Sequence, residues 1–179
     1  MQKSEARAII RDRLKALDGK LDKSKKICDK FEGLNLRFNS ILLYKALDSE
    51  VNVDSLIEKY KNNKAVYLPK VIGNDMALIR VDQNTKYGKG AFNILEPIGE
   101  ELNPKDVQID ICVTPLLGFD EALNRLGKGK GYYDKFFAVN DPIKVGMAFE
   151  TQRVEDVVFF EFDKKLDMII TEDKIYENN

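Results

Sequence analysis

The chain has 179 residues, 44% of them hydrophobic and 33% charged, a composition typical of globular proteins and not of disordered or membrane-embedded chains. Its 29 lysines and arginines against 30 aspartates and glutamates exclude a nucleic-acid or polyanion binder held by bulk charge. The absence of histidine excludes histidine-based triads and most catalytic zinc sites, so catalysis must rest on carboxylates, lysine, tyrosine, a metal or a cosubstrate.

The length fits one domain, and we expect a single domain over residues 1–179 without a linker or a repeat. Cys28 and Cys112 lie far apart and outside any C-x-x-C spacing, which predicts neither a zinc site nor a disulfide framework. The charged amino terminus and the lack of any run of 18 apolar residues predict a cytoplasmic protein without membrane contact. No exposed apolar stripe is evident, so we expect a monomer.

Helical periodicity appears first from Ser4 to Leu17, where apolar residues recur at spacings of three and four, with Ser4 as the predicted N-cap. Lys3, Arg7 and Arg11 form a second, basic stripe on this helix, which either offers cations to an anion or is a solvated edge. Two further helices are predicted at Leu21–Phe31 and at Asp54–Lys61, the latter capped by Asp54.

Short apolar runs between the helical segments predict buried strands. The runs are Ser40–Leu47, which reads as a strand entering a loop, Ala65–Pro69, Met76–Val81, Val107–Pro115, Ile143–Phe149 and Asp167–Thr171. The alternation predicts an α/β fold, a three-layer sandwich with a largely parallel central sheet flanked by helices. Because ligands of such folds gather beyond the carboxyl ends of the strands, we expect the loops after Pro69, Pro115 and Phe149 near the site.

The most unusual segment is RLGKGKGYYD, residues 125–134, in which three glycines alternate with two lysines. Alternate glycines let successive backbone N–H groups line an anion site, and the lysines with Arg125 add the charge that phosphate requires. The following YYDKFF predicts a helix whose amino terminus favours phosphate, and Asp134 is placed to hold a bridging magnesium ion. The pattern is neither a Walker motif nor a dinucleotide fingerprint, and without its flanks it also fits a surface turn.

The window from Thr114 to Phe137, with PLLGFD, RLGKGKGYYD and KFF, resembles the 5-formyltetrahydrofolate cyclo-ligase family. Weaker matches follow in the same order along nearly the whole chain: KSEAR from Lys3, a glutamate at Glu50, YLPKV from Tyr67, FNILEP from Phe92 and DKKLDMIITE from Asp163. One departure is Phe162, where the family often has an aromatic residue with histidine or tryptophan.

The resemblance implies an enzyme that consumes ATP with magnesium and converts 5-formyltetrahydrofolate, a reduced folate, into 5,10-methenyltetrahydrofolate with release of ADP and phosphate. The implied ATP-binding residues are Lys3, Arg7, Arg125, Leu126, Gly127, Lys128, Gly129, Lys130, Gly131, Tyr132 and Tyr133. The implied substrate contacts are Glu50, Lys128, Gly129, Lys130, Gly131 and Tyr132. Asp134 and Asp167 are the implied metal ligands.

The chemistry suits a chain without histidine. A formyl oxygen is a poor leaving group, so cyclisation requires its conversion into a phosphate ester by ATP, after which a neighbouring folate nitrogen attacks the activated carbon. Lys128 and Arg125 are the expected catalytic cations, because they would neutralise the γ-phosphate. Glu96 is a second candidate for the substrate pocket, unless ILEP is only a strand-ending turn, and Tyr67, Phe92 and Cys112 are expected to pack.

Two other classes of function remain open at this point. An isomerase or transferase of similar scaffold could act on sugar phosphates without ATP, because unrelated activities share scaffolds. A nucleotide-binding regulatory module would use the glycine-rich segment for binding alone. Consumption of ATP and formation of a methenyl product separate the three.

Overall fold

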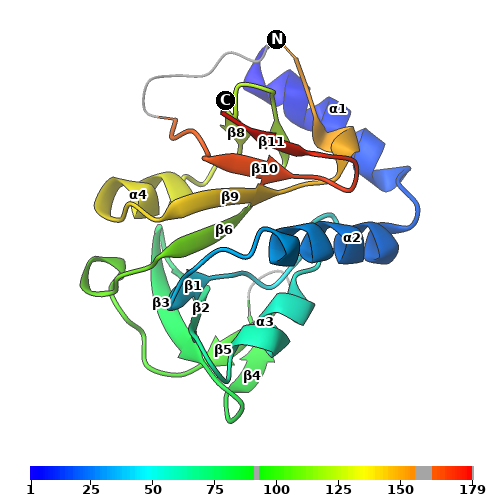
Figure 1. The fold of residues 1–179 in the computed structure, drawn as a ribbon. Coiled ribbons are helices and arrows are strands. Elements are labelled where there is room, and N and C mark those ends of the chain that lie inside the picture. The colour runs from blue at the N-terminus through cyan, green and yellow to red at the C-terminus, as the bar shows by residue number, and fades with distance from the viewer. Residues whose placement is uncertain (91–92, 156–162, 179) are drawn as a thin grey trace.

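The computed structural model describes residues 1–90, 93–155 and 163–178, and a seven-stranded sheet runs through its centre (Figure 1). Its strands, in spatial order, are β11 (Ile175–Glu177), β10 (Met168–Ile170), β9 (Ile143–Met147), β6 (Ile111–Pro115), β1 (Ser40–Leu42), β2 (Ala65–Ile72) and β3 (Asp75–Val81). The five inner strands are parallel, and the edge strands β11 and β3 are antiparallel to their neighbours. The prediction of a largely parallel sheet is confirmed.

Four helices flank this sheet: α1 (Lys3–Lys15), α2 (Lys20–Gly33), α3 (Asp54–Tyr60) and α4 (Tyr132–Val139). Alternate residues of a strand point to opposite faces, and on β1 Ile41 packs into one apolar cluster and Leu42 into another. The cluster of Ile41 includes buried residues of α1, α2 and α3, whereas that of Leu42 includes Phe136 and Phe137 of α4. Helices therefore cover both faces, which confirms the three-layer α/β fold.

The helices begin at positions slightly different from those predicted. The N-cap of α1 is Gln2 and not Ser4, and the backbone N–H of Ala6 already donates to the carbonyl of Gln2 at 3.0 Å. The N-cap of α3 is Val53, and Asp54 lies inside the first turn. Its carboxylate accepts a hydrogen bond from Lys45 Nζ at 2.9 Å, and its backbone N–H donates to Asn52 Oδ1 at 2.9 Å.

The predicted end of a strand at Pro69 is wrong, because β2 continues to Ile72. β1 pairs with β2 only as far as Tyr67, so beyond that residue β2 has β3 as its one hydrogen-bonded neighbour. A proline removes a backbone donor, and a strand tolerates this loss on an unpaired side. The predicted strand from Val107 is also shorter than expected, since β6 begins at Ile111.

Two small hairpins were not predicted. β4 (Lys86–Lys89) pairs with β5 (Leu95–Ile98), and β7 (Gly118–Phe119) pairs with β8 (Arg125–Leu126). In the described part of the chain, the 3-10 turns η2 (Pro104–Asp106) and η3 (Glu150–Gln152) lie in the connections before β6 and after β9. Within the described ranges, no helix is both long and apolar enough to cross a lipid bilayer.

Candidate active site

A cavity of about 610 Å³ opens beyond the carboxyl ends of β1 and β6. From β1 the chain order proceeds to β2 on one side, whereas β6, β9 and β10 lie on the other side, so β1 and β6 flank the point where the strand order reverses. Ligands of open α/β sheets bind at this switch point. Tyr44 and Lys45, shortly after β1, and Pro115 and Leu116, at the end of β6, all line the cavity.

The described lining carries more positive than negative charge. Six basic side chains reach it, and four carboxylates: Lys3, Arg7, Lys45, Arg125, Lys128 and Lys130, with Glu50, Glu96, Asp134 and Asp163. This local excess stands in a chain whose net charge is −1. Apolar residues of β2, β5 and the segment after β6 complete the wall: Leu68, Pro69, Val71, Leu95, Pro97, Leu116 and Leu117. The cavity can therefore hold a polyanion beside an apolar group.

The glycine-lysine loop, residues 127–131, connects β8 to α4. Gly129 and Gly131 have φ of +100° and +71°, which glycine adopts without a steric penalty, and Gly131 is the N-cap of α4. No side chain caps this helix, so its first backbone N–H groups are available beside the loop. Tyr132 fixes the helix to the turn between β2 and β3, where its hydroxyl donates to the carbonyl of Gly73 at 3.1 Å.

Arg125 lies under the loop, with 6% of its side chain exposed. Its Nη2 donates to Asp134 Oδ1 at 3.1 Å, and its guanidinium lies over the ring of Tyr133, 5.6 Å from the centroid. Among the described residues, Arg125 Nε and the Tyr133 hydroxyl have no hydrogen-bond partner although both atoms are buried. Burial raises the pKa of Tyr133 well above its usual value of 10, so the hydroxyl keeps its proton. Buried polar atoms of this kind favour a bound polar ligand.

Two contacts fix the loop to other elements. Arg7 of α1 donates from Nε to the carbonyl of Gly127 at 3.0 Å. On another side, Lys128 Nζ donates to Glu50 Oε1 at 2.5 Å, and Glu50 Oε2 accepts a hydrogen bond from the Leu47 backbone at 2.9 Å. The structure thus brings together Lys3, Arg7, Glu50 and the whole predicted segment from Arg125 to Asp134 around one cavity.

Asp167, the second predicted metal ligand, is not brought to this cavity. It precedes β10, and its Oδ2 accepts a hydrogen bond from the backbone of Lys144 near the start of β9, at 2.7 Å. Because β9 and β10 are parallel, these are the amino ends of the strands, whereas the cavity lies beyond the carboxyl ends. Asp163, four residues earlier, lines the cavity and forms an ion pair with Lys3 at 2.5 Å. No cluster of three metal-binding side chains occurs in the described part of the chain.

The other expectations about the site had mixed outcomes. The segment after Pro115 lines the cavity, as does Glu96 of β5, but the turn after Phe149 is not part of the described lining. Cys112 is fully buried, which raises the pKa of its thiol to about 12, and it packs as expected, as does Tyr67. Phe92 and Phe162 lie outside the described residues.

Sequence reasoning missed Tyr44, Lys45 and Asp163 as lining residues. Tyr44 is 2% exposed and donates to the carbonyl of Val51 at 2.8 Å. Tyr44 and Lys45 lie in the second half of the predicted run Ser40–Leu47, where the strand was expected to enter a loop, and this was the available signal, because ligand-binding residues concentrate at such strand ends.

Comparison with known proteins agrees with this geometry. The model of the 5-formyltetrahydrofolate cyclo-ligase family matches residues 2–172. The chain is 30% identical to a probable 5-formyltetrahydrofolate cyclo-ligase of Schizosaccharomyces pombe, over 99% of this chain and 98% of that protein. It is 34% identical to the 5-formyltetrahydrofolate cyclo-ligase of Haemophilus influenzae, over 66% of this chain and 67% of that protein.

Solved structures give the same result. The NMR structure of the Aquifex aeolicus 5,10-methenyltetrahydrofolate synthetase superposes with a TM-score of 0.82 at 32% identity, covering 98% of this chain and 92% of that one. The 5,10-methenyltetrahydrofolate synthetase of Mycoplasma pneumoniae gives a TM-score of 0.75 at 29% identity, covering 96% and 99%. With its fold, its cavity and its sequence in agreement, the chain belongs to the 5-formyltetrahydrofolate cyclo-ligase family.

Proposed function

We propose that this protein catalyses the ATP- and magnesium-dependent cyclisation of 5-formyltetrahydrofolate to 5,10-methenyltetrahydrofolate, with release of ADP and phosphate. The observation that carries the proposal is the single cavity in which a cationic loop at a helix amino terminus faces an apolar wall bearing carboxylates. The reaction requires a triphosphate and a reduced folate in contact with each other. One cavity with a phosphate-binding side and an apolar side meets that requirement.

The proposed reaction has two steps. The formyl oxygen attacks the γ-phosphorus of ATP, the bond from that phosphorus to the bridging oxygen breaks, and ADP leaves. The neighbouring folate nitrogen then attacks the formyl carbon and loses its proton, and the carbon–oxygen bond breaks to release phosphate. Both steps develop charge on phosphate oxygens, so positioning and charge neutralisation are what the protein must supply.

The loop residues bind the nucleotide in this proposal. Lys128 and Arg125 neutralise the transferred phosphoryl group, while backbone N–H groups of residues 126–133 surround the phosphates. Arg7 already contacts the loop at Gly127 and adds a further cation with Lys3. To engage a phosphate, Lys128 exchanges its carboxylate partner Glu50 for phosphate oxygens, which are equally strong acceptors.

The opposite wall binds the folate. Glu50 lines the cavity with 9% of its side chain exposed, and its two oxygens accept hydrogen bonds from the Leu47 backbone and from Lys128. A carboxylate so held can accept hydrogen bonds from the N–H groups of a pterin ring. Glu96 of β5 supplies a second carboxylate on the apolar wall. Lys130 and Tyr132 extend the contact between the two substrates.

The donor set fits a magnesium ion bound mainly by substrate phosphates. Magnesium takes one or two carboxylates and retains its waters, and the described cavity offers Asp134 beside the loop and Asp163 beside Lys3. When bound, the ion would withdraw charge from the phosphate oxygens. Asp134 also orients Arg125, so it has a role for this chain's own residues as well.

The decisive experiment mixes purified protein with 5-formyltetrahydrofolate, ATP and magnesium and follows the near-ultraviolet absorbance of the methenyl product. We expect product only when all three are present, with one ADP formed per methenyl group. Turnover of a sugar phosphate without ATP would favour an isomerase or transferase. Nucleotide binding with no product from any reduced folate would leave a regulatory module and end the cyclo-ligase proposal.

The proposal includes a cytoplasmic, monomeric enzyme built as one domain. Both cysteines are free and buried, which suits a reducing compartment. Light scattering during size-exclusion chromatography is expected to give the mass of one chain. A single cooperative unfolding transition is expected for one domain.

A further inference from the structure

The turn η3 carries Gln152, a polar side chain only 1% exposed. Its Oε1 accepts a hydrogen bond from the backbone of Phe149 at 2.7 Å. Its Nε2 donates to the carbonyls of Leu116 at 2.8 Å and Leu117 at 2.9 Å. A primary amide has two donor protons, and here each faces a carbonyl oxygen. A buried amide so fully bonded fixes a particular backbone arrangement in addition to filling space.

The two carbonyls that Gln152 holds belong to consecutive residues of the cavity wall. Leu116 and Leu117 follow β6 at the switch point of the sheet, and both line the cavity. The backbone of Leu117 donates to the carbonyl of Leu126 at 2.9 Å, immediately before the glycine-lysine loop. Gln152, the wall and the base of the loop therefore form one hydrogen-bonded unit. Gln152 itself is not among the described residues that line the cavity.

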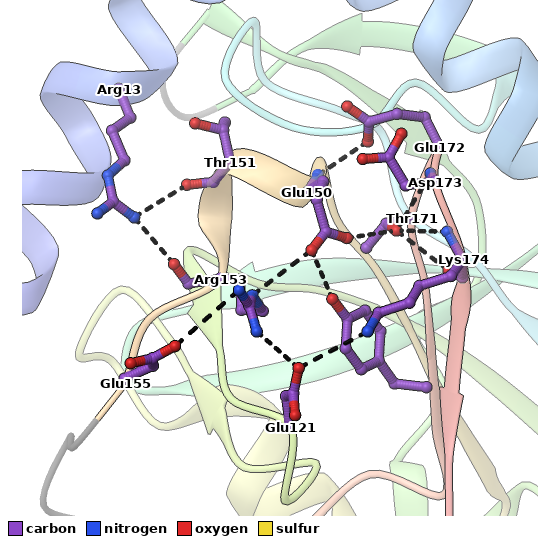
Figure 2. A network of polar contacts seen from close by, with 11 residues as sticks. Arg13, Glu121, Glu150, Thr151, Arg153, Glu155, Thr171, Glu172, Asp173 and Lys174 are labelled. Carbon is purple, nitrogen blue, oxygen red and sulfur yellow. Dashed lines mark hydrogen bonds and ion pairs between the residues drawn. The ribbon is translucent and has the colours of Figure 1, made fainter.

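The turn that carries Gln152 is itself anchored on several sides, as Figure 2 shows. The backbone of Glu150 donates to Glu172 Oε2 at 2.8 Å, and the Glu150 carboxylate accepts hydrogen bonds from the hydroxyls of Thr171, at 2.8 Å, and Tyr176. From α1, Arg13 donates to the carbonyl of Arg153 at 2.9 Å. These contacts connect the turn to the hairpin of β10 and β11 and to α1, so Gln152 projects from a fixed support.

We propose that Gln152 is a positioning residue for the reaction in the cavity. It acts through Leu116 and Leu117, whose carbonyls it holds so that the wall and the glycine-lysine loop keep the distance that transfer between two substrates requires. The inference rests on the proposed cyclo-ligase function. Displacement of reacting groups by about 1 Å costs on the order of a hundredfold in rate, so loss of this support is expected to reduce kcat more than substrate binding.

Two substitutions test the inference. Gln152→Glu keeps the shape and one acceptor but removes both donors, and Gln152→Met removes all three hydrogen bonds at similar volume. We expect kcat to fall about 10- to 100-fold in both, with KM for ATP and folate changed less than about threefold. The carboxyl introduced by Gln152→Glu faces two carbonyl oxygens, which raises its pKa. Its protonated form restores one donor, so the activity relative to wild type is expected to rise as pH falls.

Controls separate positioning from stability. Ile27→Val, a substitution in the core on α2, should lower the melting temperature without changing kcat per folded molecule. Arg13→Ala loosens the same turn from an exposed position, so it is expected to fold, and its kcat should fall about threefold in the same direction. If neither Gln152 variant folds, the kcat of Arg13→Ala tests whether support of this turn affects the reaction.

The outcomes are distinguishable from those of the proposed function. If wild-type protein forms no methenyl product, the cyclo-ligase proposal fails. Faster amide exchange at Leu117, whose N–H donates to the Leu126 carbonyl at the base of the loop, in folded Gln152→Glu then still reports loss of the support without any turnover. If wild type is active and the folded variants, Arg13→Ala included, match it in kcat, pH profile and amide exchange, Gln152 only stabilises the fold and the inference is overturned.

Discussion

The two sides of the cavity are encoded in different ways. The proposed phosphate-binding side comes mainly from ten consecutive residues, 125–134, with Lys3 and Arg7 added by α1, and the ten residues are visible as a pattern in the sequence. The opposite wall is assembled from Tyr44, Glu50, Pro69 and Glu96, which belong to separate elements and meet only in the folded chain. Phosphate recognition by a loop is local, whereas a surface complementary to a large organic substrate has to be collected from several strands. The predictions that follow test whether the two sides also divide the chemistry.

The largest effect is expected for Lys128→Ala. Lys128 is proposed to neutralise the transferred phosphoryl group, and removal of one such charge costs about 100- to 1000-fold in kcat. The matched control is Lys135→Ala on α4, which lies outside the described lining and pairs with Asp75. We expect wild-type circular dichroism in both variants and loss of turnover only in the first. A kcat within twofold of wild type for Lys128→Ala would remove the loop from the mechanism.

The next effect concerns magnesium. Asp134→Asn and Asp163→Asn are each expected to raise the magnesium concentration for half-maximal rate by about tenfold or more, because each removes one carboxylate from the cavity. Asp167→Asn serves as the control, since its carboxylate bonds to the Lys144 backbone at the other edge of the sheet. Magnesium titrations of the three variants decide whether the ion is held by Asp134 with Asp163 or by Asp134 with Asp167. A shift for Asp167→Asn equal to that for Asp134→Asn would restore Asp167 as a ligand.

On the opposite wall, Glu50→Gln is expected to raise KM for the folate about tenfold and KM for ATP less than about threefold, because a hydrogen bond to a carboxylate contributes roughly 1.4 kcal/mol more than one to the neutral amide oxygen of glutamine. Glu96→Gln is the matched comparison on the same wall and should have a smaller effect in the same direction. Initial rates with each substrate varied in turn give the two KM values. If Glu50→Gln raises KM for ATP more than KM for the folate, the two sides of the cavity do not bind separate substrates as proposed.

The smallest effect is expected for Arg7→Met. Its Nε bonds to the Gly127 carbonyl, and the loss of one such hydrogen bond, about 1 kcal/mol, predicts a rise of about fivefold in KM for ATP. Arg11→Met removes a cation of the same helical stripe that does not line the cavity, and it should leave KM for ATP unchanged. Equal effects in the two variants would indicate a general influence of charge, in place of a specific contact.

The sequence alone predicted the layers of the fold and the position of the loop, because both depend on local patterns. The layers follow from the spacing of apolar residues, and the loop follows from the alternation of glycine and lysine. Ala6, Ile10 and Leu14 recur at helical spacing on α1 and are buried, as expected. Helix caps were mispredicted by two residues at Ser4 and by one at Asp54, because the first backbone hydrogen bond of the helix, and not the residue type alone, sets where it begins. Pro69 stands inside a strand because the neighbouring strand β1 is short, and no local pattern reveals the length of a neighbour.

The site could be predicted only in part for the same reason. Strands of two residues, such as β7 and β8, are too short to show a period, although they set the base of the loop. The spacing of Asp163 and Asp167 does not show which of them reaches the cavity, because tertiary contacts decide it, with Lys3 for Asp163 and with the Lys144 backbone for Asp167. A residue that acts through other residues, as proposed for Gln152, cannot be recognised from the sequence. Its role becomes visible only when the structure shows which backbone carbonyls it bonds to.

The closure of the cavity by both ends of the chain has a consequence for synthesis on the ribosome. Lys3 pairs with Asp163 and Arg13 with the Arg153 carbonyl, across 160 and 140 residues. A nascent chain that has emerged as far as α4 already contains the whole glycine-lysine loop but lacks β9, β10 and Asp163. The site that we propose for the nucleotide is therefore completed only near the end of translation, when Asp163 has emerged.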